Sequence, residues 1–356
     1  MRSERLAFAV AQAVLLAIAA ALVATIYGLP LRDPDGILGP TYVRLPAILA
    51  MVVVVDVVPR IVHRMFRAGL GLQSGIRRLS ATTEAVFRER WSLDRSRFVF
   101  LGLGSWYLTY VAFRNLKGYV PFVNPGVDDA RFAGLDRWIF LGHDPAVLLH
   151  ELLGVGVAAH LMSFVYVAWL VFIPFSIAGV LIWGREASAG AWYVTAMGVD
   201  WVLGVATYYA FPTLGPVYSS PQAFASLPDT RAAALQTSMY ADRAEVLADP
   251  IATHAVQSIA AFASLHVGML MTACLIAHLL GLHRWVRRAL WSFLALTVLA
   301  TVYLGWHFFV DAVGGAAIGA LAVGISAVAT RTRIRQLRRG GARAAELTTA
   351  VRRPVG

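Results

Sequence analysis

Charged residues are scarce in this chain. They make up 14% of its 356 residues, whereas hydrophobic residues make up 58%, and the mean hydropathy is +0.66. An ordinary soluble domain carries about 25% charged residues. The composition therefore excludes a typical water-soluble enzyme and predicts an integral membrane protein. Such a chain must cross the bilayer as helices, because lipid cannot satisfy the hydrogen bonds of an irregular backbone.

Cysteine and lysine are almost absent. The single cysteine, Cys274, excludes an intramolecular disulfide and a metal site built from several thiolates. Lysine occurs once, at Lys117, and the other 30 basic residues are arginines. We interpret the net charge of +11 as a signature of membrane topology rather than of nucleic-acid binding, because the arginines gather in particular loops.

Long apolar runs are present instead. They are about 20 residues long, enough for a helix to cross ~30 Å of hydrocarbon. We predict an all-α integral membrane protein with about eight transmembrane helices, at 6–28, 43–62, 97–117, 157–183, 189–211, 264–282, 286–305 and 307–329. The chain then divides into two added helices with a basic amphipathic segment (1–96), a six-helix catalytic core (97–330) and a basic tail (331–356).

Basic residues alternate between loops. The loop at 60–97, the turn at 283–288 and the tail are strongly basic, whereas the 118–156 segment is net acidic. Arginine favours the cytoplasmic side of a membrane, and an even number of spans returns the chain to its starting side. Both termini are therefore predicted to be cytoplasmic. The arginine bias is typical of a GC-rich bacterial genome, which indicates a multi-pass protein of a bacterial plasma membrane.

Polar side chains converge at the opposite, outer face. His266 begins the sixth predicted span, His307 and Asp311 begin the eighth, and Arg114 and Lys117 end the third. Ionisable groups at membrane depth are rare and usually functional. Topology alone therefore predicts that these side chains, which are distant in sequence, meet near the outer leaflet.

The spacing of these residues suggests their chemistry. His307 and Asp311 are four residues apart and share one face of a helix, so Asp311 can hold one imidazole nitrogen and leave the other free to react. Ser264 lies near a helix N-terminus, where N–H groups favour an anion. Arg114 and Lys117 would add positive charge for a phosphate.

A metal site is a lower-ranked alternative. His266, His307 and Asp311 are zinc ligands by residue type, but the sequence lacks an HExxH-like helix. We therefore predict no metal and no other cofactor.

Three segments resemble a known family. "ASLHVG" (263–268) and "TVYLGWHFFVDAVGG" (301–315) resemble the Ser-x-His and His-x-x-x-Asp motifs of the type-2 phosphatidic acid phosphatase superfamily. The nearer match is its inositol phosphorylceramide synthase-like branch, which shares a Thr-x-Tyr-Leu-x-x-His-x-x-x-Asp pattern. "YYAFPTLGPVY" (208–218) resembles that branch's Tyr-x-x-Pro-Thr element. The resemblance covers roughly 97–329.

The resemblance implies a phosphohistidine mechanism and a phosphatase-like core of six helices. His307 matches the nucleophile that takes the phosphoryl group, Asp311 the carboxylate that orients it, and His266 the acid that protonates the leaving group. Tyr303 and Tyr209 match motif positions and join Ser264, Arg114 and Lys117 as candidates for binding substrate or phosphate.

Two departures from the phosphatase pattern favour the transferase-like branch. Ala300 and Thr301 occupy the positions where the phosphatases carry Ser-Arg, and the Lys-x6-Arg-Pro motif is missing. We therefore predict a lipid phosphotransferase that moves a phosphoryl or phospho-headgroup, for example of the phosphoinositol type, from a lipid phosphate or phospholipid to an alcohol.

Two alternatives remain at this point. One is a lipid-phosphate or polyprenyl-phosphate phosphatase of the same superfamily, and the other is a non-catalytic lipid-phosphate carrier, although polar residues gathered at one face favour an enzyme. A minor expectation is an acceptor site lined by loop residues Asp136, Arg137, His143 or Asp144. The expected partners are the lipid substrate and the bilayer, without nucleic acid.

Overall fold

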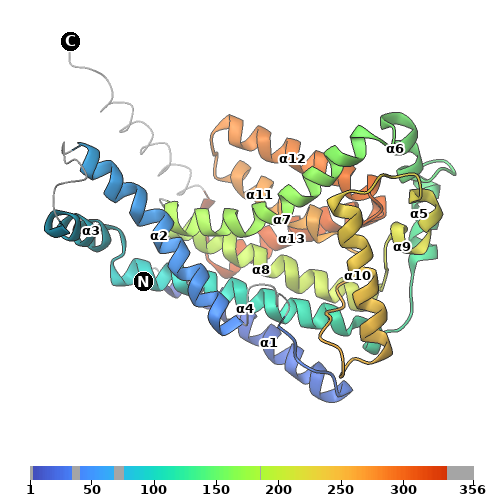
Figure 1. Ribbon diagram of the computed structural model, residues 1–356, viewed down its shortest axis with the longest axis horizontal. Helices are drawn as coiled ribbons and strands as arrows, with labels where there is room; N and C mark the ends of the chain where they lie inside the picture. Colours follow the sequence, from blue (N-terminus) through green and yellow to red (C-terminus); the bar gives the residue numbers. More distant parts are fainter. Residues whose placement is uncertain (1–2, 34–40, 68–75, 185, 335–356) are drawn as a thin grey trace, which may run out of the picture.

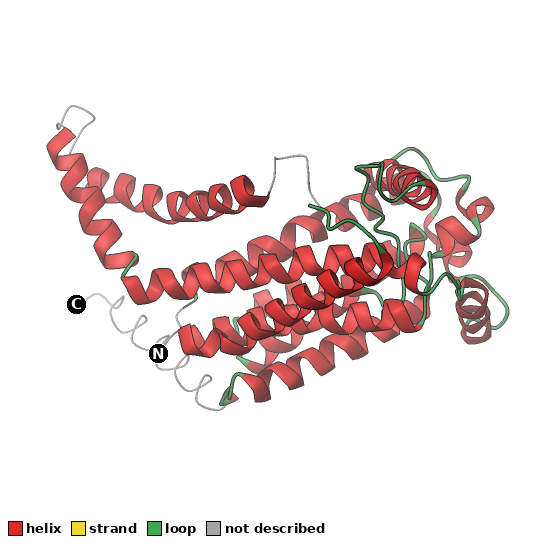
Figure 2. Cartoon of the chain, turned by 90° about the horizontal axis from the view of Figure 1, so that it is seen from below, coloured by secondary structure: helices red, strands yellow, loops and turns green. Residues whose placement is uncertain are grey.

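The computed structural model describes residues 3–33, 41–67, 76–184 and 186–334, and within these ranges it contains helices and no strands (Figure 2). The α-helices are α1 (Ala7–Tyr27), α2 (Thr41–Arg67), α3 (Ile76–Arg90), α4 (Leu93–Val123), α5 (Asp129–Ile139), α6 (Pro145–Leu153), α7 (Val157–Trp183), α8 (Ala187–Ala210), α9 (Pro216–Ser219), α10 (Arg231–Ala248), α11 (Leu265–Leu279), α12 (Arg284–Tyr303) and α13 (Phe309–Ala329). Two 3₁₀ helices, η1 (Ser3–Leu6) and η3 (Pro221–Phe224), complete the set.

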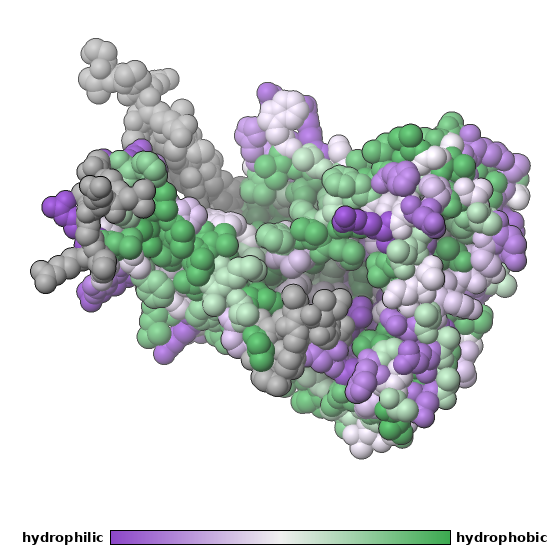
Figure 3. Space-filling view, viewed as in Figure 1, coloured by the Kyte–Doolittle hydropathy of each residue, from purple (hydrophilic) through white to green (hydrophobic). Residues whose placement is uncertain are grey.

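The long helices form a bundle with different structures at its two ends (Figure 1). Helices α1, α4, α7, α8, α11, α12 and α13 run alongside one another, and α8 packs against α4, α11 and α13. The shorter helices α5, α6, α9 and α10 gather at one end, and α2 and α3 extend at the other. Figure 3 shows hydrophobic side chains over much of the bundle and α2, with hydrophilic ones mixed among them at the α10 end.

Within the described parts of the chain, five helices are long and apolar enough to cross a membrane, namely Glu4–Tyr27, Pro46–Arg67, Val157–Trp183, Arg284–Tyr303 and Phe309–Ala329. Helix α11 is apolar but has only 15 residues. Every predicted span overlaps a helix, yet α4 and α8 do not meet the same criteria. The chain is thus a multi-pass membrane protein in which length and composition support five spans, and the count of eight stays a prediction.

Helix α8 shows why composition undercounts spans. All residues from 190 to 201 are buried, including Trp192 and Met197 with no exposed surface. A helix enclosed by other helices does not face lipid, so it can be built from small, aromatic and polar residues rather than from a run of aliphatic ones. Its place at the centre of the bundle holds the surrounding helices in register.

A buried carboxylate ties the N-terminal region to the core. Asp56 of α2 accepts hydrogen bonds from Arg60 (3.2 Å), Arg90 (3.1 Å) and the indole nitrogen of Trp183 (2.9 Å). Its side chain is fully buried, so these bonds offset the cost of removing the charge from water. This cluster anchors α2 and α3 to the end of α7. Of the predicted basic tail, only Arg331–Ile334 fall within the described residues.

Candidate functional site

Two histidines and an aspartate form a hydrogen-bonded line near one end of the bundle. Nδ1 of His266, in the first turn of α11, lies 3.0 Å from Nε2 of His307. Nδ1 of His307 lies 3.2 Å from Oδ2 of Asp311. His307 is 4% exposed and Asp311 is fully buried. The structure thus brings together the three residues that the sequence predicted to converge.

His307 occupies a tight turn rather than a helix, because α12 ends at Tyr303 and α13 begins at Phe309. The predicted span at 307–329 therefore began two residues too early. Gly305 makes the turn with φ of +72°, a backbone conformation that favours glycine. The amide of His307 donates to the Thr301 carbonyl (3.2 Å). His307 and Asp311 pair across the start of α13 instead of along a helix face.

Asp311 has a second structural task. Its Oδ2 also accepts the backbone N–H of Phe308 (3.0 Å), which caps the start of α13. The capping bond and the His307 bond share one oxygen, and Oδ1 is buried without a partner. The cap fixes the carboxylate, and the fixed carboxylate sets the orientation of the His307 ring.

Glycines let α11 and α13 approach closely behind the site. A Cβ atom at Gly315 would lie 2.2 Å from the Ser264 carbonyl oxygen, and one at Gly319 would lie 2.4 Å from the Gly268 carbonyl oxygen. The Ser264 amide also donates to the Asp311 carbonyl (3.0 Å). This close crossing determines where His266 stands relative to His307.

Helix α4 supplies positive charge. The Lys117 Nζ lies 4.9 Å from the centre of the Tyr208 ring, and it is close enough to both histidines to interact electrostatically with them. Arg114, one turn earlier, is close enough to interact with Lys117 and with Asp242 of α10, and its Nε is buried without a hydrogen bond. The structure therefore places the two predicted cations on the α4 side of the histidine pair.

The other three predicted binding residues make structural contacts. Ser264 is fully buried at the N-cap of α11, where its Oγ accepts from the Val267 amide (3.5 Å). The Tyr303 hydroxyl donates to the Gly154 carbonyl (2.7 Å), and the Tyr209 hydroxyl donates to the Leu116 carbonyl (2.8 Å). All three hydroxyls thus bond to the protein backbone.

Thr213 makes the contact that links the Tyr-x-x-Pro-Thr segment to the site. Its Oγ1 accepts from the Phe262 amide (2.8 Å), and its carbonyl accepts from the Ala261 amide (2.9 Å). These bonds hold the segment that leads into α11. The motif thus positions His266 indirectly, by holding the segment before α11. The sequence analysis did not assign this role to the motif.

Aromatic residues of α7 surround His266, and the sequence reasoning missed them. The Trp169 ring centre lies 4.3 Å from that of His266, and its indole N–H donates to the His266 carbonyl (2.9 Å). Tyr166 lies 5.0 Å from His266 and stacks on Trp306 at 4.8 Å. An apolar span carries no local signal for which of its aromatics faces a polar partner.

The predicted acceptor residues of the loop have other uses. Both carboxylate oxygens of Asp136 accept from the start of α13, at the amides of Phe309 (2.7 Å) and Val310 (2.9 Å). Burial raises the pKa of the Asp136 carboxyl to about 6. Asp144 caps α6 through the Ala146 amide (2.9 Å). The carboxylates of Asp136 and Asp144 therefore hold helix ends, and the expectation that they line an acceptor site stays a prediction.

The other two residues of that expectation, Arg137 and His143, are exposed at the same end of the helix bundle. Neither makes a described contact with the histidine pair. Among the residues that the structure describes, no group of three or more His, Cys, Asp or Glu side chains is arranged to hold a metal ion.

The role of Asp136 gives a testable prediction. Asp136→Ala removes an acceptor from two amides at the start of α13, so we expect a loss of ~1–2 kcal/mol in the free energy of unfolding. Thermal unfolding in detergent measures it. Asp128→Ala is the control, since the Asp128 side chain makes no capping bond. Equal melting temperatures for the two variants would contradict the capping role.

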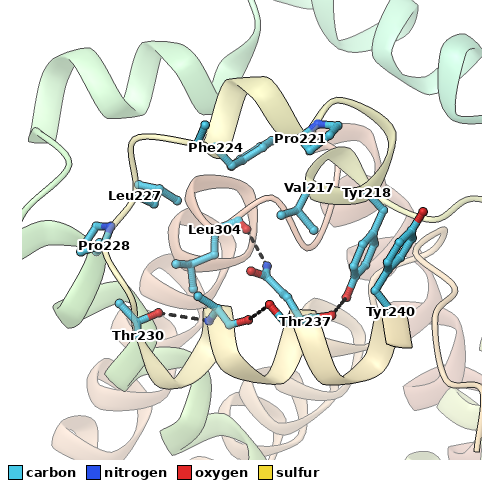
Figure 4. A pocket seen from close by; sticks show the side chains of 14 residues that line it. Val217, Tyr218, Pro221, Phe224, Leu227, Pro228, Thr230, Thr237, Tyr240 and Leu304 are labelled. Carbon is cyan, nitrogen blue, oxygen red and sulfur yellow. Dashed lines mark hydrogen bonds between the residues drawn. The ribbon is translucent and has the colours of Figure 1, made fainter. Parts of the chain in front are cut away.

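A cavity of about 370 Å³ opens beside the turn that carries His307, which we call the catalytic turn in the proposals below (Figure 4). Its walls come from α9, η3, the loop at 225–230 and α10, with one residue from α7 and one, Leu304, directly after α12. They include Val217, Tyr218, Phe224, Leu227, Tyr240 and Leu304. No sequence motif predicted this cavity.

The comparison with known proteins agrees with the motifs. A family model of the PAP2 superfamily matches residues 130–325, which is more than half of the chain. The matched region contains His266, His307 and Asp311, whereas Arg114 and Lys117 precede it. No curated protein and no solved structure matches the chain. The inositol phosphorylceramide synthase-like branch stays a prediction.

Proposed function

The chain belongs to the PAP2 superfamily, and on that premise we propose that it is a lipid phosphotransferase that moves a phosphoryl or phospho-headgroup from a lipid to an alcohol. Membership supports a membrane enzyme of the phosphatase and phosphotransferase type. The observation that carries the proposal is the line from His266 through His307 to Asp311, with contacts of 3.0 and 3.2 Å.

The proposed first step uses both histidines. Asp311 accepts a hydrogen bond from the Nδ1–H of His307, so Nε2 carries a lone pair that attacks phosphorus. The Nε2–phosphorus bond forms while the bond to the leaving oxygen breaks, and His266, which starts as the imidazolium, gives its Nδ1 proton to that oxygen and becomes neutral. The ionised Asp311 balances the positive imidazolium of the phosphohistidine. A phosphate that enters this site replaces the contact between the two rings.

The second step reverses the first with a different alcohol. His266, now lacking its proton, takes one from the acceptor hydroxyl, whose oxygen attacks phosphorus as the Nε2–phosphorus bond breaks. General acid–base help of this kind contributes ~10²–10⁴-fold in rate. Lys117 and Arg114 supply charge for the phosphate oxygens during both steps. Burial of His307 behind aromatic side chains limits water, which favours an alcohol as acceptor.

A donor and acceptor assay tests the proposal. The protein in lipid nanodiscs is incubated with a labelled phospholipid and a panel of alcohols, and the products are separated. We expect label on the alcohol with wild type and none with His307→Ala. Release of free phosphate without transfer would establish the phosphatase alternative. Binding of the phospholipid without either product would establish a carrier.

Membrane sidedness is part of the proposal: both termini in the cytoplasm of a bacterial cell and the site at the outer face. On a Cys274→Ala background, we expect an impermeant thiol reagent to label Thr237→Cys in intact cells, since Thr237 is exposed beside the cavity. His283→Cys, in the turn after α11 at the far end, should react only after permeabilisation. The reverse pattern would invert the topology.

A further inference from the structure

The cavity beside the catalytic turn has an uncharged lining. Its walls are made of apolar and aromatic side chains together with two threonines and a glutamine, and none of the lining residues carries a charge. Its volume of about 370 Å³ falls in the ~300–1,000 Å³ range of small-molecule sites. A phosphate or another ion would find no counter-charge here.

Four of the five polar side chains in its walls make hydrogen bonds to the protein backbone (Figure 4). The Thr230 hydroxyl oxygen accepts from the Ala233 amide (3.1 Å), and the Thr237 hydroxyl donates to the Ala233 carbonyl (3.1 Å). The Gln236 side-chain amide donates to the Leu304 carbonyl (2.7 Å), and the Tyr218 hydroxyl donates to the Gln236 carbonyl (3.2 Å). A sugar or polyol would have to break such bonds, whereas a hydrocarbon chain needs none of them.

The cavity borders the turn that carries His307. Leu304 lines it, and the Gly305 carbonyl accepts from the Val217 amide of its wall (2.9 Å). Tyr218, another wall residue, packs against Trp306 with ring centres 6.5 Å apart. Trp306 in turn stacks on Tyr166, and Tyr166 packs against His266, so a chain of aromatic contacts links the wall to His266.

The cavity is also next to a lipid-facing helix. Ala159 of α7 lines it, and the same part of α7 exposes Val157 (77%), Leu161 (58%) and Phe164 (72%) on its outer surface. The Ala232 amide of α10 donates to Ser163 of α7, which holds the cavity wall onto that helix. The cavity therefore adjoins an apolar outer surface of α7.

We propose that this cavity binds one hydrocarbon chain, acyl or prenyl, of the lipid whose phosphate reacts at His307. The inference rests on the proposed function for the identity of the reacting group, and it names the feature of the substrate that the protein recognises. An uncharged lining whose polar side chains mostly bond to the protein backbone and a position between α7 and the turn that carries His307 both select an apolar chain. The cavity thereby sets the preference of the enzyme for long-chain substrates.

A matched pair of variants tests this by activity. Ala233 lines the cavity, whereas Ala234, the next residue of α10, is exposed and does not. The ratio of kcat/KM for dioleoyl over dihexanoyl phosphatidic acid is measured for each. We expect Ala233→Phe to lower this ratio about tenfold or more, as expected for lost methylene contacts, and Ala234→Phe to leave it unchanged. An unchanged ratio in Ala233→Phe would overturn the proposal.

A binding measurement separates this proposal from the proposed reaction. Phosphatidic acid with a diazirine on one acyl chain is photo-crosslinked to the protein in nanodiscs, and the labelled peptides are identified by mass spectrometry. We expect label within residues 217–240 in wild type and in His307→Ala, and its loss in Ala233→Phe. Label that persists in Ala233→Phe, or that is displaced by a free polyol, would overturn chain binding whether or not the enzyme turns over.

Discussion

Replacing His307 by alanine is expected to lower kcat/KM by a factor on the order of 10⁴ to 10⁶, as removal of a nucleophile does in other covalent mechanisms. Nε2 of His307 is the atom that forms the bond to phosphorus in the proposed reaction, and His266 sits 3.0 Å from it as the proton donor. With the nucleophile gone, a bound substrate has no group to attack it. Initial rates with a long-chain lipid phosphate measure the loss.

The control for this experiment is a second histidine at the same end of the molecule. His143 is exposed in the turn between α5 and α6 and has no described contact with the site, so His143→Ala should keep full activity. Asp311→Asn should fall between the two, since it keeps the shape of the side chain but not the charge that orients the ring. A His307→Ala enzyme with more than a tenth of wild-type activity would contradict a nucleophilic role.

Adding one methyl group at Gly315 is expected to disable the enzyme without touching a reacting atom. Its Cβ would lie 2.2 Å from the Ser264 carbonyl oxygen and 3.2 Å from the Gly268 amide, so backbone rather than a flexible side chain would have to move. Overpacking of this kind costs ~1–3 kcal/mol in stability. Because Ser264 lies two residues before His266, α11 would move His266 away from His307. A misplacement of ~1 Å costs about 10²-fold in rate.

Gly324 provides the matched control on the same helix. Nothing lies within 4 Å of a Cβ at Gly324, so Gly324→Ala should keep wild-type activity and equal or higher thermal stability. The measurements are kcat/KM and the midpoint of thermal unfolding in one detergent. If Gly315→Ala matched Gly324→Ala in both, the close crossing of α11 and α13 would not position the site.

The coarse fold and the three residues of the hydrogen-bonded line could be predicted from the sequence. The apolar runs predicted a helical multi-pass membrane protein, which the structure confirms. Charge sidedness predicted that His266, His307 and Asp311 lie at one membrane face, and in the structure His307 is within hydrogen-bonding distance of both His266 and Asp311. Such inference works because successive membrane-spanning helices run in alternating directions, so the topology determines which helix ends share a membrane face. The resemblance to the PAP2 superfamily is confirmed by the family match.

The local geometry around the two histidines could not be predicted from the sequence. His307 lies in a turn because Gly305 takes a positive φ, and the residue pattern alone allowed a helix to start at either point. Asp136 read as a loop residue open to a ligand, yet its carboxylate caps α13 from a helix more than 170 residues earlier in the chain. Tyr166 and Trp169 resemble the other aromatics of an apolar span. Contacts of this kind depend on tertiary packing, for which a single sequence holds no periodic signal.

The central claim is that phosphorus becomes bonded to His307, and trapping that bond tests it most directly. The protein and its His266→Ala and His307→Ala variants are mixed with ³²P-labelled lipid phosphate, quenched in base and digested for mass spectrometry. The account predicts an acid-labile, base-stable phosphoryl group on the peptide that contains His307, and none in His307→Ala. Label on another residue, or turnover in wild type without any phosphoenzyme on a rapid-quench timescale, would contradict it.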